Sequence, residues 1–204
     1  MSGHMLDNQR TRAIANRGFV PIANFLLKMG LSANSVTVIT GLSLVLIVLS
    51  TIPFGRFGYA LLLSLPLVFG DALDGTMARM TNSTSKFGGF LDSVVDRFTD
   101  ATIVGAFIAW AIYANDHVTS LVAMGALATG FLIPYIRAKA ESVGIDCKVG
   151  LMERTERLLV LGVITLFAAF GVESAIGIGL SALFLLNSVT VAQRLSHVYQ
   201  RDRV

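Results

Sequence analysis

Six uncharged, strongly apolar stretches divide the chain, and they constrain its fold more than any other feature. They occupy residues 29–55, 57–70, 101–115, 117–136, 158–172 and 174–193. An α-helix needs about 20 residues to cross the hydrocarbon core of a bilayer, and the first, fourth and sixth stretches reach that length unaided. Hydrophobic residues make up 54% of the chain and charged residues only 14%. That balance excludes soluble, disordered and fibrous proteins, because an average soluble domain carries about 25% charged residues.

The three shorter stretches reach spanning length only if each continues into a charged flank. We expect these helices over residues 57–79, 90–113 and 153–172, so that three helices carry ionisable groups near the membrane boundary. The predicted fold is an all-α integral membrane protein with six transmembrane helices. We expect one membrane domain over residues 1–204, in which residues 34–195 form the six-helix catalytic bundle and residues 1–5 (MSGHM) are a cloning remnant.

An amphipathic helix is predicted ahead of the first span. Residues 10–29 interleave four basic residues with six apolar residues at helical spacing: Ile14, Phe19, Ile22, Phe25, Leu26 and Met29. This pattern is typical of a juxtamembrane helix that lies on the membrane surface. The alternative is a solvated tail.

The distribution of basic residues predicts the orientation. We number the six predicted helices one to six in chain order. Of the 16 Lys and Arg residues, all except Arg56 lie in four places: the amino-terminal segment, the connection between helices 2 and 3, the connection between helices 4 and 5, and the carboxyl-terminal tail, together with the adjoining helix ends. By the positive-inside rule, both termini and the charged ends of helices 2, 3 and 5 are cytoplasmic. The net charge of +3 is too small to indicate a nucleic-acid partner, and the single cysteine, Cys147, excludes an internal disulfide.

Four aspartates lie in the charged flanks of helices 2 and 3. Asp71 and Asp74 are spaced i, i+3, and Asp92 and Asp96 are spaced i, i+4, so each pair shares one face of its helix. The connection between the helices is short, so we expect them to be antiparallel neighbours and all four carboxylates to converge. Such a cluster needs cations, and ligands that are all oxygen favour Mg2+ or Mn2+. The spacing predicts a site for two metal ions and a phosphate-containing ligand.

Other interpretations of the aspartates stay open at this point. Asp71 and Asp74 could pair with Arg79, while Asp92 and Asp96 pair with Arg97, and the nearby glycines could serve helix packing alone. Buried carboxylates also occur in the ion or proton pathways of transporters. Against a pathway, helices 1, 4 and 6 carry no ionisable residue in their middles.

Residues 71–96 read DALDGTMARMTNSTSKFGGFLDSVVD, which follows the pattern D-x2-D-G-x2-A-R-x8-G-x3-D-x3-D. This segment resembles the signature of the CDP-alcohol phosphotransferases, and the six-helix layout is similar to that family over nearly the whole chain. The resemblance implies transfer of a phosphatidyl group from a CDP-linked donor to a hydroxyl acceptor, with release of CMP. It also implies a homodimer in the plasma membrane of a bacterium, with a cytoplasmic active site.

The resemblance assigns roles to individual residues. The metal ligands would be Asp71, Asp74, Asp92 and Asp96, holding two Mg2+ ions or Mn2+, and Asp96 would also accept the proton of the attacking hydroxyl. The residues expected at the donor nucleotide are Asn34, Ser35, Val36, Thr37, Gly75, Arg79 and Ser85. An ordinary helix cap at Asn34 or Ser35 is the alternative for that part of the set.

The acceptor is suggested by basic residues on the catalytic side. The candidates for binding an acceptor phosphate are Arg137, Lys139, Lys148, Arg154, Arg157 and Arg194. The alternative is that they are membrane anchors, with Arg154 and Arg157 offset by Glu153 and Glu156. The segments FGDALDGTMAR, SKFGGFLDS, YIRAKAES and GLMERTERL are similar to actinobacterial members that use CDP-diacylglycerol and inositol 1-phosphate. Glycerol 3-phosphate is the second candidate acceptor, and a cation or proton transporter is a third interpretation.

Overall fold

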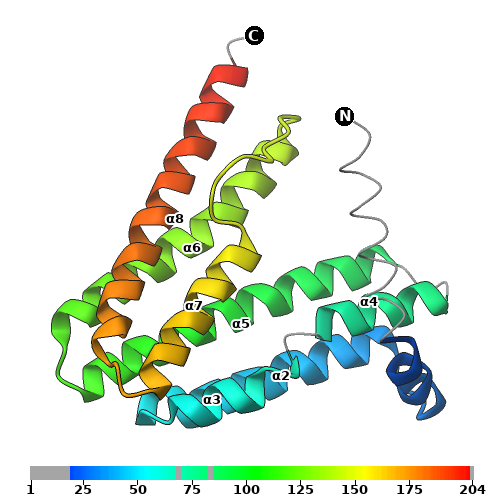
Figure 1. The fold of residues 1–204 in the computed structure, drawn as a ribbon. Helices are drawn as coiled ribbons and strands as arrows, with labels where there is room; N and C mark the ends of the chain where they lie inside the picture. Colours follow the sequence, from blue (N-terminus) through cyan, green and yellow to red (C-terminus); the bar gives the residue numbers. More distant parts are fainter. Residues whose placement is uncertain (1–18, 68–69, 82–84, 203–204) are drawn as a thin grey trace, which may run out of the picture. The chain divides into compact units, whose positions relative to one another are not determined.

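The computed structural model describes residues 19–67, 70–81 and 85–202, except for the side chains of residues 71 and 72. Its described part is helical, with a longer connection over residues 143–153 between α6 and α7 (Figure 1). A first helix covers Phe19–Lys28. The other elements are α2 (Ala33–Thr51), the 3-10 helix η1 (Ile52–Phe54), α3 (Phe57–Ser64), α4 (Gly70–Met80), α5 (Lys86–Tyr113), α6 (His117–Ser142), α7 (Arg154–Ala169) and α8 (Ser174–Arg201).

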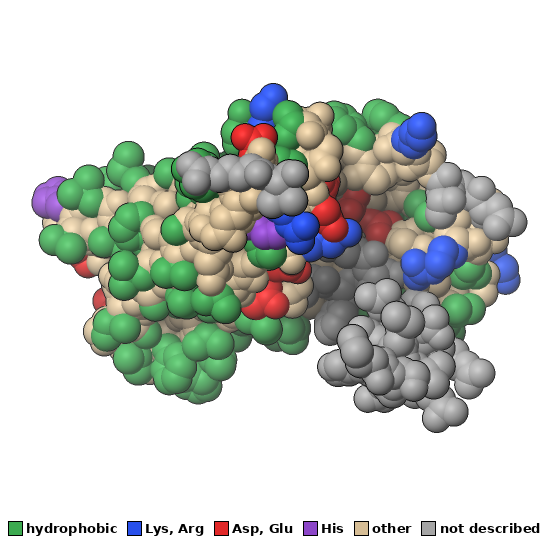
Figure 2. Space-filling model, turned by 90° about the horizontal axis from the view of Figure 1, so that it is seen from above, with side chains coloured by type: hydrophobic (Ala, Val, Ile, Leu, Met, Phe, Trp, Pro, Cys, Tyr) green, Lys and Arg blue, Asp and Glu red, His purple; other side chains and the backbone are tan. Residues whose placement is uncertain are grey.

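Within the described residues, three helical segments are long and apolar enough to cross a membrane. They are Ala33–Phe54, His117–Ser142 and Ser174–Arg201. These correspond to the three stretches that the sequence predicts to span unaided, so three of the six predicted spans are confirmed on length and composition. Figure 2 shows hydrophobic side chains over much of the face in view, as expected for a surface that meets lipid.

The predicted helix over residues 57–79 is interrupted. Helix α3 ends at Ser64 and α4 begins at Gly70. Pro66 lies between them, and a proline lacks the backbone N–H that would continue the helix and disfavours the helical conformation of the residue before it. The signature residues of α4 therefore belong to a separate helix of 11 residues.

The chain forms two compact units. The first comprises Met1–Leu44 and Ser64–Thr99, and the second comprises Val45–Leu63 and Asp100–Val204. One boundary falls at the end of α3, beside Pro66, while the others fall inside α2 and α5. The first unit holds all four signature aspartates, and the second holds α6, α7, α8 and the later part of α5.

In the first unit, the Phe19–Lys28 helix packs on α2 and α4. Ala23, Val36 and Met77 are buried together, and Leu26 and Leu73 pack against them. Phe25 and Met29, on the other side of this segment, are exposed. The amphipathic helix predicted over residues 10–29 is thus present over its described part, while residues 10–18 lie outside the described residues.

A close approach of α2 and α5 completes the first unit. A Cβ atom on Gly41 would come within 2.3 Å of the Val95 Cγ1 atom, which is far inside van der Waals contact. A side chain at position 41 would therefore force the two helices apart or drive Val95 from its rotamer.

In the second unit, α8 packs against α6 and α7 (Figure 1). Gly179 of α8 meets Ile164 of α7, and Gly125 of α6 meets Phe184 of α8. The buried Asn187 side chain donates from Nδ2 to the Ala126 carbonyl at 3.2 Å. Small residues thus allow the helices to approach closely, and a polar bond ties α8 to α6.

Candidate active site

Local capping places the signature residues on two helices of the first unit. Helix α4 ends at Met80, where the Thr81 hydroxyl donates to the Met77 carbonyl at 2.9 Å. Helix α5 begins at Lys86, and the Ser85 hydroxyl accepts from the Gly88 backbone N–H at 2.9 Å. A side-chain oxygen at this position satisfies an N–H that the helix itself leaves without a partner. Asp92 and Asp96 then occupy successive turns of one face of α5.

Asp74 is the most deeply placed of the described signature carboxylates. It is 8% exposed, and the Thr37 hydroxyl of α2 donates to its Oδ2 atom. Thr37 is itself 7% exposed. A buried carboxylate is costly without hydrogen bonds, so Thr37 stabilises Asp74 in its position without neutralising its charge.

The residues predicted at the donor nucleotide fall into two local groups. Arg79 lies over Gly75, where a Cβ atom would come 3.4 Å from its Nη1 atom, and its Nη2 atom donates to the Thr76 hydroxyl at 3.1 Å. A Cβ atom on Gly88 would come 3.1 Å from the Asn34 Oδ1 atom and 3.3 Å from the Ser85 hydroxyl. Asn34 and Ser85 therefore converge on one glycine where α2 meets α5.

The interpretation of Asn34 or Ser35 as the cap of α2 is wrong. The cap is Ser32, whose hydroxyl accepts from the Ser35 backbone N–H at 3.1 Å, and α2 begins at Ala33. Asn34 and Ser35 are thus first-turn residues. Val36 is 4% exposed and belongs to the apolar core of the first unit, so its side chain serves packing.

The pairing of Asp96 with Arg97 is loose. Arg97 Nη2 lies 3.9 Å from Asp96 Oδ2, which is longer than a hydrogen bond of about 2.7 to 3.2 Å. Both side chains are partly exposed, at 30% and 14%. This contact is an ion pair of the two neighbouring residues without a direct hydrogen bond between these two atoms.

The donor chemistry of the first unit fits a hard divalent cation. Asp74, Asp92 and Asp96 supply carboxylate oxygens, and Thr37 orients one of them. Among the described side chains, no three Asp, Glu, His or Cys groups lie close enough together to hold a metal ion. The side chain of Asp71, the fourth predicted ligand, is outside the described set.

The predicted acceptor residues lie in the second unit, where two of them share one carboxylate. Arg157 Nη2 donates to Asp100 Oδ2 at 2.6 Å, and Arg154 Nε lies 3.5 Å from Asp100 Oδ1. Glu153 and Glu156, which offset the two arginines in the alternative interpretation, form the capping box at the start of α7. Sequence reasoning missed Asp100, although it follows Asp96 by one helical turn.

The other four basic residues have different surroundings. The Arg194 side chain is 2% exposed and donates to two backbone carbonyls, from Nε to Val149 at 2.8 Å and from Nη1 to Ile133 at 2.5 Å. Arg137 pairs with Glu141 at 3.0 Å, and Lys148 pairs with Asp146 at 3.1 Å. Lys139 is exposed. Two of the six predicted residues, Arg154 and Arg157, thus contact one carboxylate, and Arg194 is buried against backbone carbonyls. The other three side chains lie at the surface of the unit.

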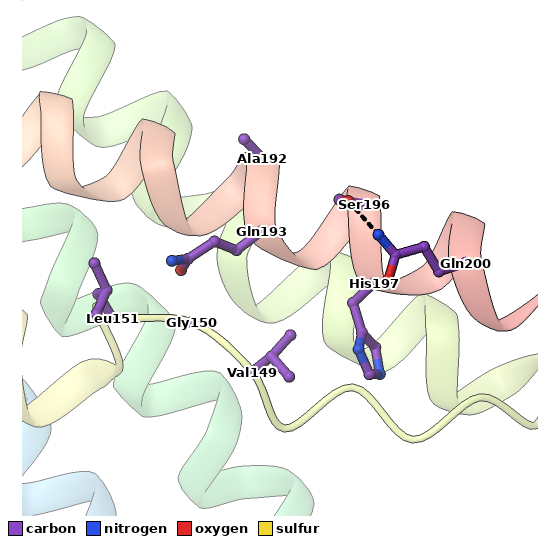
Figure 3. Close-up of a pocket in the computed structure, with 8 residues that line it drawn as sticks. All are labelled: Val149, Gly150, Leu151, Ala192, Gln193, Ser196, His197 and Gln200. Atoms are coloured by element: carbon purple, nitrogen blue, oxygen red, sulfur yellow. Dashed lines mark hydrogen bonds between the residues drawn. The ribbon is translucent and has the colours of Figure 1, made fainter.

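A groove of about 610 Å³ lies along the last turns of α8 (Figure 3). Its lining consists of Val149, Gly150, Leu151, Ala192, Gln193, Ser196, His197 and Gln200. The Gln200 side chain donates to the Ser196 hydroxyl at 3.3 Å, as the dashed line in Figure 3 marks. Gly150 has a φ of 125°, and a Cβ there would come 2.5 Å from Thr190 Cγ2, so glycine is required. None of the six predicted acceptor residues lines this groove.

Comparison with known proteins supports the family indicated by the signature. Residues 31–192 match the model of the CDP-alcohol phosphatidyltransferase family. The phosphatidylinositol phosphate synthase of Streptomyces avermitilis is 34% identical over 201 residues, which cover 95% of this chain and 82% of that enzyme. The enzyme of the same name from Cutibacterium acnes is 38% identical over 184 residues, covering 86% of this chain and 89% of that enzyme.

Two crystal structures of the Mycobacterium tuberculosis phosphatidylinositol phosphate synthase are also similar. The structure with CDP-DAG bound has a TM-score of 0.83 and 29% identity, covering 90% of this chain and 94% of the other. The structure in complex with manganese and citrate has a TM-score of 0.84 and 29% identity, covering 89% and 88%. With the eight-position signature on α4 and α5 and a family match over residues 31–192, this chain belongs to the CDP-alcohol phosphatidyltransferase family.

Proposed function

We propose that this protein is a phosphatidylinositol phosphate synthase that transfers the phosphatidyl group of CDP-diacylglycerol to inositol 1-phosphate. The observation that carries the proposal is its identity of 34% to 38%, over most of the chain, to enzymes of that name. In the reaction, the acceptor hydroxyl oxygen forms a bond to the phosphatidyl phosphorus of the donor. The bond from that phosphorus to the oxygen of CMP breaks, and CMP leaves with the bonding electrons.

The first unit supplies the carboxylates for this step. We assign four aspartates as ligands of two divalent cations, which are Mg2+ or, alternatively, Mn2+: Asp71, Asp74, Asp92 and Asp96. A cation bound there would supply positive charge to stabilise the donor's pyrophosphate and the CMP leaving group. Asp96 accepts the proton of the attacking hydroxyl. Its place as the last aspartate of the signature, one helical turn after Asp92 on α5, supports this role.

The CMP portion of the donor is assigned to the residues around Gly75 and Gly88. Arg79 beside Gly75 provides a guanidinium for a phosphate, and Asn34 and Ser85 flank Gly88 with hydrogen-bonding groups. Ser35, Val36 and Thr37 complete the first turn of α2. Because the Val36 side chain is in the core, its contribution would come from the backbone.

The acceptor phosphate is assigned mainly to Arg154 and Arg157. Both belong to α7, and together with Asp100 they form a group of two positive charges and one negative charge. Two guanidiniums held side by side suit an alcohol that itself carries a phosphate. Arg137, Lys139, Lys148 and Arg194 take secondary parts, Arg194 chiefly by holding the 149–150 segment through the Val149 carbonyl.

The membrane arrangement follows from the charges. We propose six spans, in which α3 with α4, α5 and α7 add to the three long apolar helices. Both termini and the signature carboxylates face the cytoplasm of a bacterial cell, the enzyme is a homodimer, and the Phe19–Lys28 helix lies on the membrane surface. Gly177 and Gly179 are occupied by packing within the chain, against Thr119 and Ile164, so they do not support a dimer contact.

The test is a comparison of acceptors with purified protein. CMP release is measured with CDP-diacylglycerol, Mg2+ and either inositol 1-phosphate, glycerol 3-phosphate or inositol, with the Asp96→Asn variant as the inactive control. We expect turnover with inositol 1-phosphate and little with the other two. Turnover with glycerol 3-phosphate alone would instead identify a phosphatidylglycerophosphate synthase. Ion flux in liposomes without nucleotide would support the transporter interpretation.

A further inference from the structure

Asp100 connects the two arginines assigned to the acceptor, although it lies outside the family signature. It belongs to α5, whereas Arg154 and Arg157 belong to α7. The two guanidiniums approach different oxygens of its carboxylate, Arg157 at Oδ2 with 2.6 Å and Arg154 at Oδ1 with 3.5 Å. One carboxylate therefore holds both arginines of the first turn of α7.

The nearest acidic residues in the sequence do not take this role. Glu153 and Glu156 form the capping box of α7, and a carboxylate oxygen of Glu156 accepts from the Glu153 backbone N–H at 3.1 Å. A helix that begins with this arrangement uses its own acidic side chains to satisfy backbone groups. The arginines are thus directed toward α5.

Burial distinguishes the members of this group. The Arg157 side chain is 7% exposed, Asp100 is 17% exposed and Arg154 is 24% exposed. Arg157 has the short bond and the least solvent, so it is the anchor of the group. Arg154 has the longer contact and more solvent, and it is the guanidinium that a dissolved anion reaches first.

The chemistry of the group favours an anionic ligand. A guanidinium carries five N–H donors, so one guanidinium can contact a carboxylate and a phosphate at the same time. Holding the guanidiniums in place before the ligand arrives removes part of the entropy that two long side chains would lose on binding. An uncharged polyol would gain less from two guanidiniums than an alcohol that carries a phosphate.

We propose that Asp100 is a positioning residue for the acceptor, which holds the Arg154 and Arg157 guanidiniums in the orientation that receives the acceptor's phosphate. This inference rests on the proposed function. It adds that recognition of a phosphorylated alcohol depends on a carboxylate outside the signature.

The Asp100→Asn variant separates two physical effects of opposite sign. If Asp100 mainly offsets positive charge, its removal strengthens the attraction for an anion and the acceptor KM falls. If Asp100 positions the arginines, we expect the acceptor KM to rise about tenfold. We expect kcat and the CDP-diacylglycerol KM to change less than about threefold, since the variant leaves the donor residues in place. A fall in the acceptor KM, or no change, overturns the proposal.

The Asp100→Glu variant provides a second test that keeps the charge. A longer side chain displaces the carboxylate, so positioning predicts a higher acceptor KM, whereas simple charge compensation predicts no change. Asp116→Asn is the matched control, because Asp116 caps α6 and an asparagine caps a helix equally well. We expect this control to keep both KM values. A purely structural defect at Asp100 would lower kcat with both KM values unchanged, and that result would also overturn the proposal.

The experiment distinguishes failure of this inference from failure of the proposed function. Turnover of inositol 1-phosphate by the unmodified protein tests the function alone. Binding is measured separately, as the rise in Tm that inositol 1-phosphate causes without CDP-diacylglycerol. We expect this rise in the unmodified protein and its loss in Asp100→Asn. If inositol 1-phosphate raises the Tm of both the unmodified protein and Asp100→Asn, the result supports inositol 1-phosphate as the acceptor. The same result overturns the proposed role of Asp100.

Discussion

Asp74 in the first unit and the pair Arg154 and Arg157 in the second unit are held by different kinds of partner. In the first unit, the carboxylate of Asp74 receives a hydrogen bond from the neutral hydroxyl of Thr37. In the second unit, the guanidiniums of Arg154 and Arg157 contact the charged carboxylate of Asp100. The Thr37 hydroxyl holds Asp74 without adding an opposite charge to it. The Asp100 carboxylate holds the two guanidiniums and adds one opposite charge to them.

This difference matches the ligands proposed for each unit. A divalent cation would offset the desolvation of the Asp74 carboxylate, and the Thr37 hydroxyl orients that carboxylate without neutralising it. The phosphate of an alcohol acceptor must bind and leave in each cycle. Partial compensation by Asp100 orients two arginines while moderating the charge that the acceptor meets. The following predictions test whether residues of the first unit bind the cation and residues of the second unit bind the acceptor phosphate.

The largest effect is expected at Asp96. Asp96→Asn removes the proposed proton acceptor, so kcat measured by CMP release at saturating Mg2+ should fall about 10² to 10⁴-fold. Binding of CDP-diacylglycerol should persist, because the donor residues around Gly75 and Gly88 are unchanged. Equal loss of donor binding and turnover would remove the assignment of Asp96 as the base.

A smaller effect is expected at Thr37, which orients Asp74 in the first unit. Thr37→Val keeps the shape but removes the donor to Oδ2, so the Mn2+ concentration for half-maximal CMP release should rise about 10 to 100-fold. Thr37→Ser keeps a hydroxyl and is the matched control. The acceptor KM should stay unchanged in both variants. A change in the acceptor KM equal to that in Mn2+ dependence would contradict the division between the units.

A packing change in the second unit should affect stability. A Cβ at Gly179 would come 2.3 Å from Ile164 Cγ1, so Gly179→Ala should destabilise the protein by about 1 to 3 kcal/mol and lower Tm in detergent. Gly162→Ala is the control in the same unit, since no atom lies within 4 Å of a Cβ there. That variant should keep or slightly raise Tm, because alanine favours a helix over glycine by about 0.5 to 1 kcal/mol. A lower Tm in the control would show that glycine at helical positions of this unit is needed for another reason.

The smallest effect is expected at Asp116, away from both groups of charged side chains. Its carboxylate accepts from the Thr119 hydroxyl at 2.6 Å and from the Thr119 N–H at 3.0 Å, and these bonds lower the pKa of Asp116 below its ordinary value of 3.8. Because the folded-state pKa is the lower one, the stabilisation is present above about pH 4 and is lost as the pH falls through the folded-state value.

The corresponding measurement is the Tm difference between the unmodified protein and Asp116→Ala as a function of pH. The difference should be constant at neutral pH and shrink in acid. A difference that grows in acid would contradict the cap as the source of the low pKa. Acceptor and donor kinetics should be unaffected at neutral pH.

Local pattern was sufficient for much of the fold. The stretches at 29–55, 117–136 and 174–193 are long and apolar without interruption, so length alone identified the helices that can span a membrane. The signature likewise placed Asp92 and Asp96 on one helix, because i, i+4 spacing needs only helical geometry. The break between α3 and α4 was missed, although Pro66 is a local signal for it.

The cap of α2 illustrates how small the remaining errors were. Asn34, Ser35 and Ser32 are all residues that cap helices, and propensity does not choose among them. The choice of Ser32 follows from where the chain enters α2, which depends on packing of the Phe19–Lys28 helix against Val36 and Met77.

The sequence by itself determined the membrane class, the family and the identity of the signature aspartates, because these depend on short-range periodicity and spacing. Only the tertiary structure decided which partner each charged side chain takes. Thr37 meets Asp74 across 37 residues, and Asp100 meets Arg154 and Arg157 across 54 and 57 residues. Such pairings depend on how helices pack, and a charged group in a protein of this kind takes its chemical character from the partner that packing brings to it.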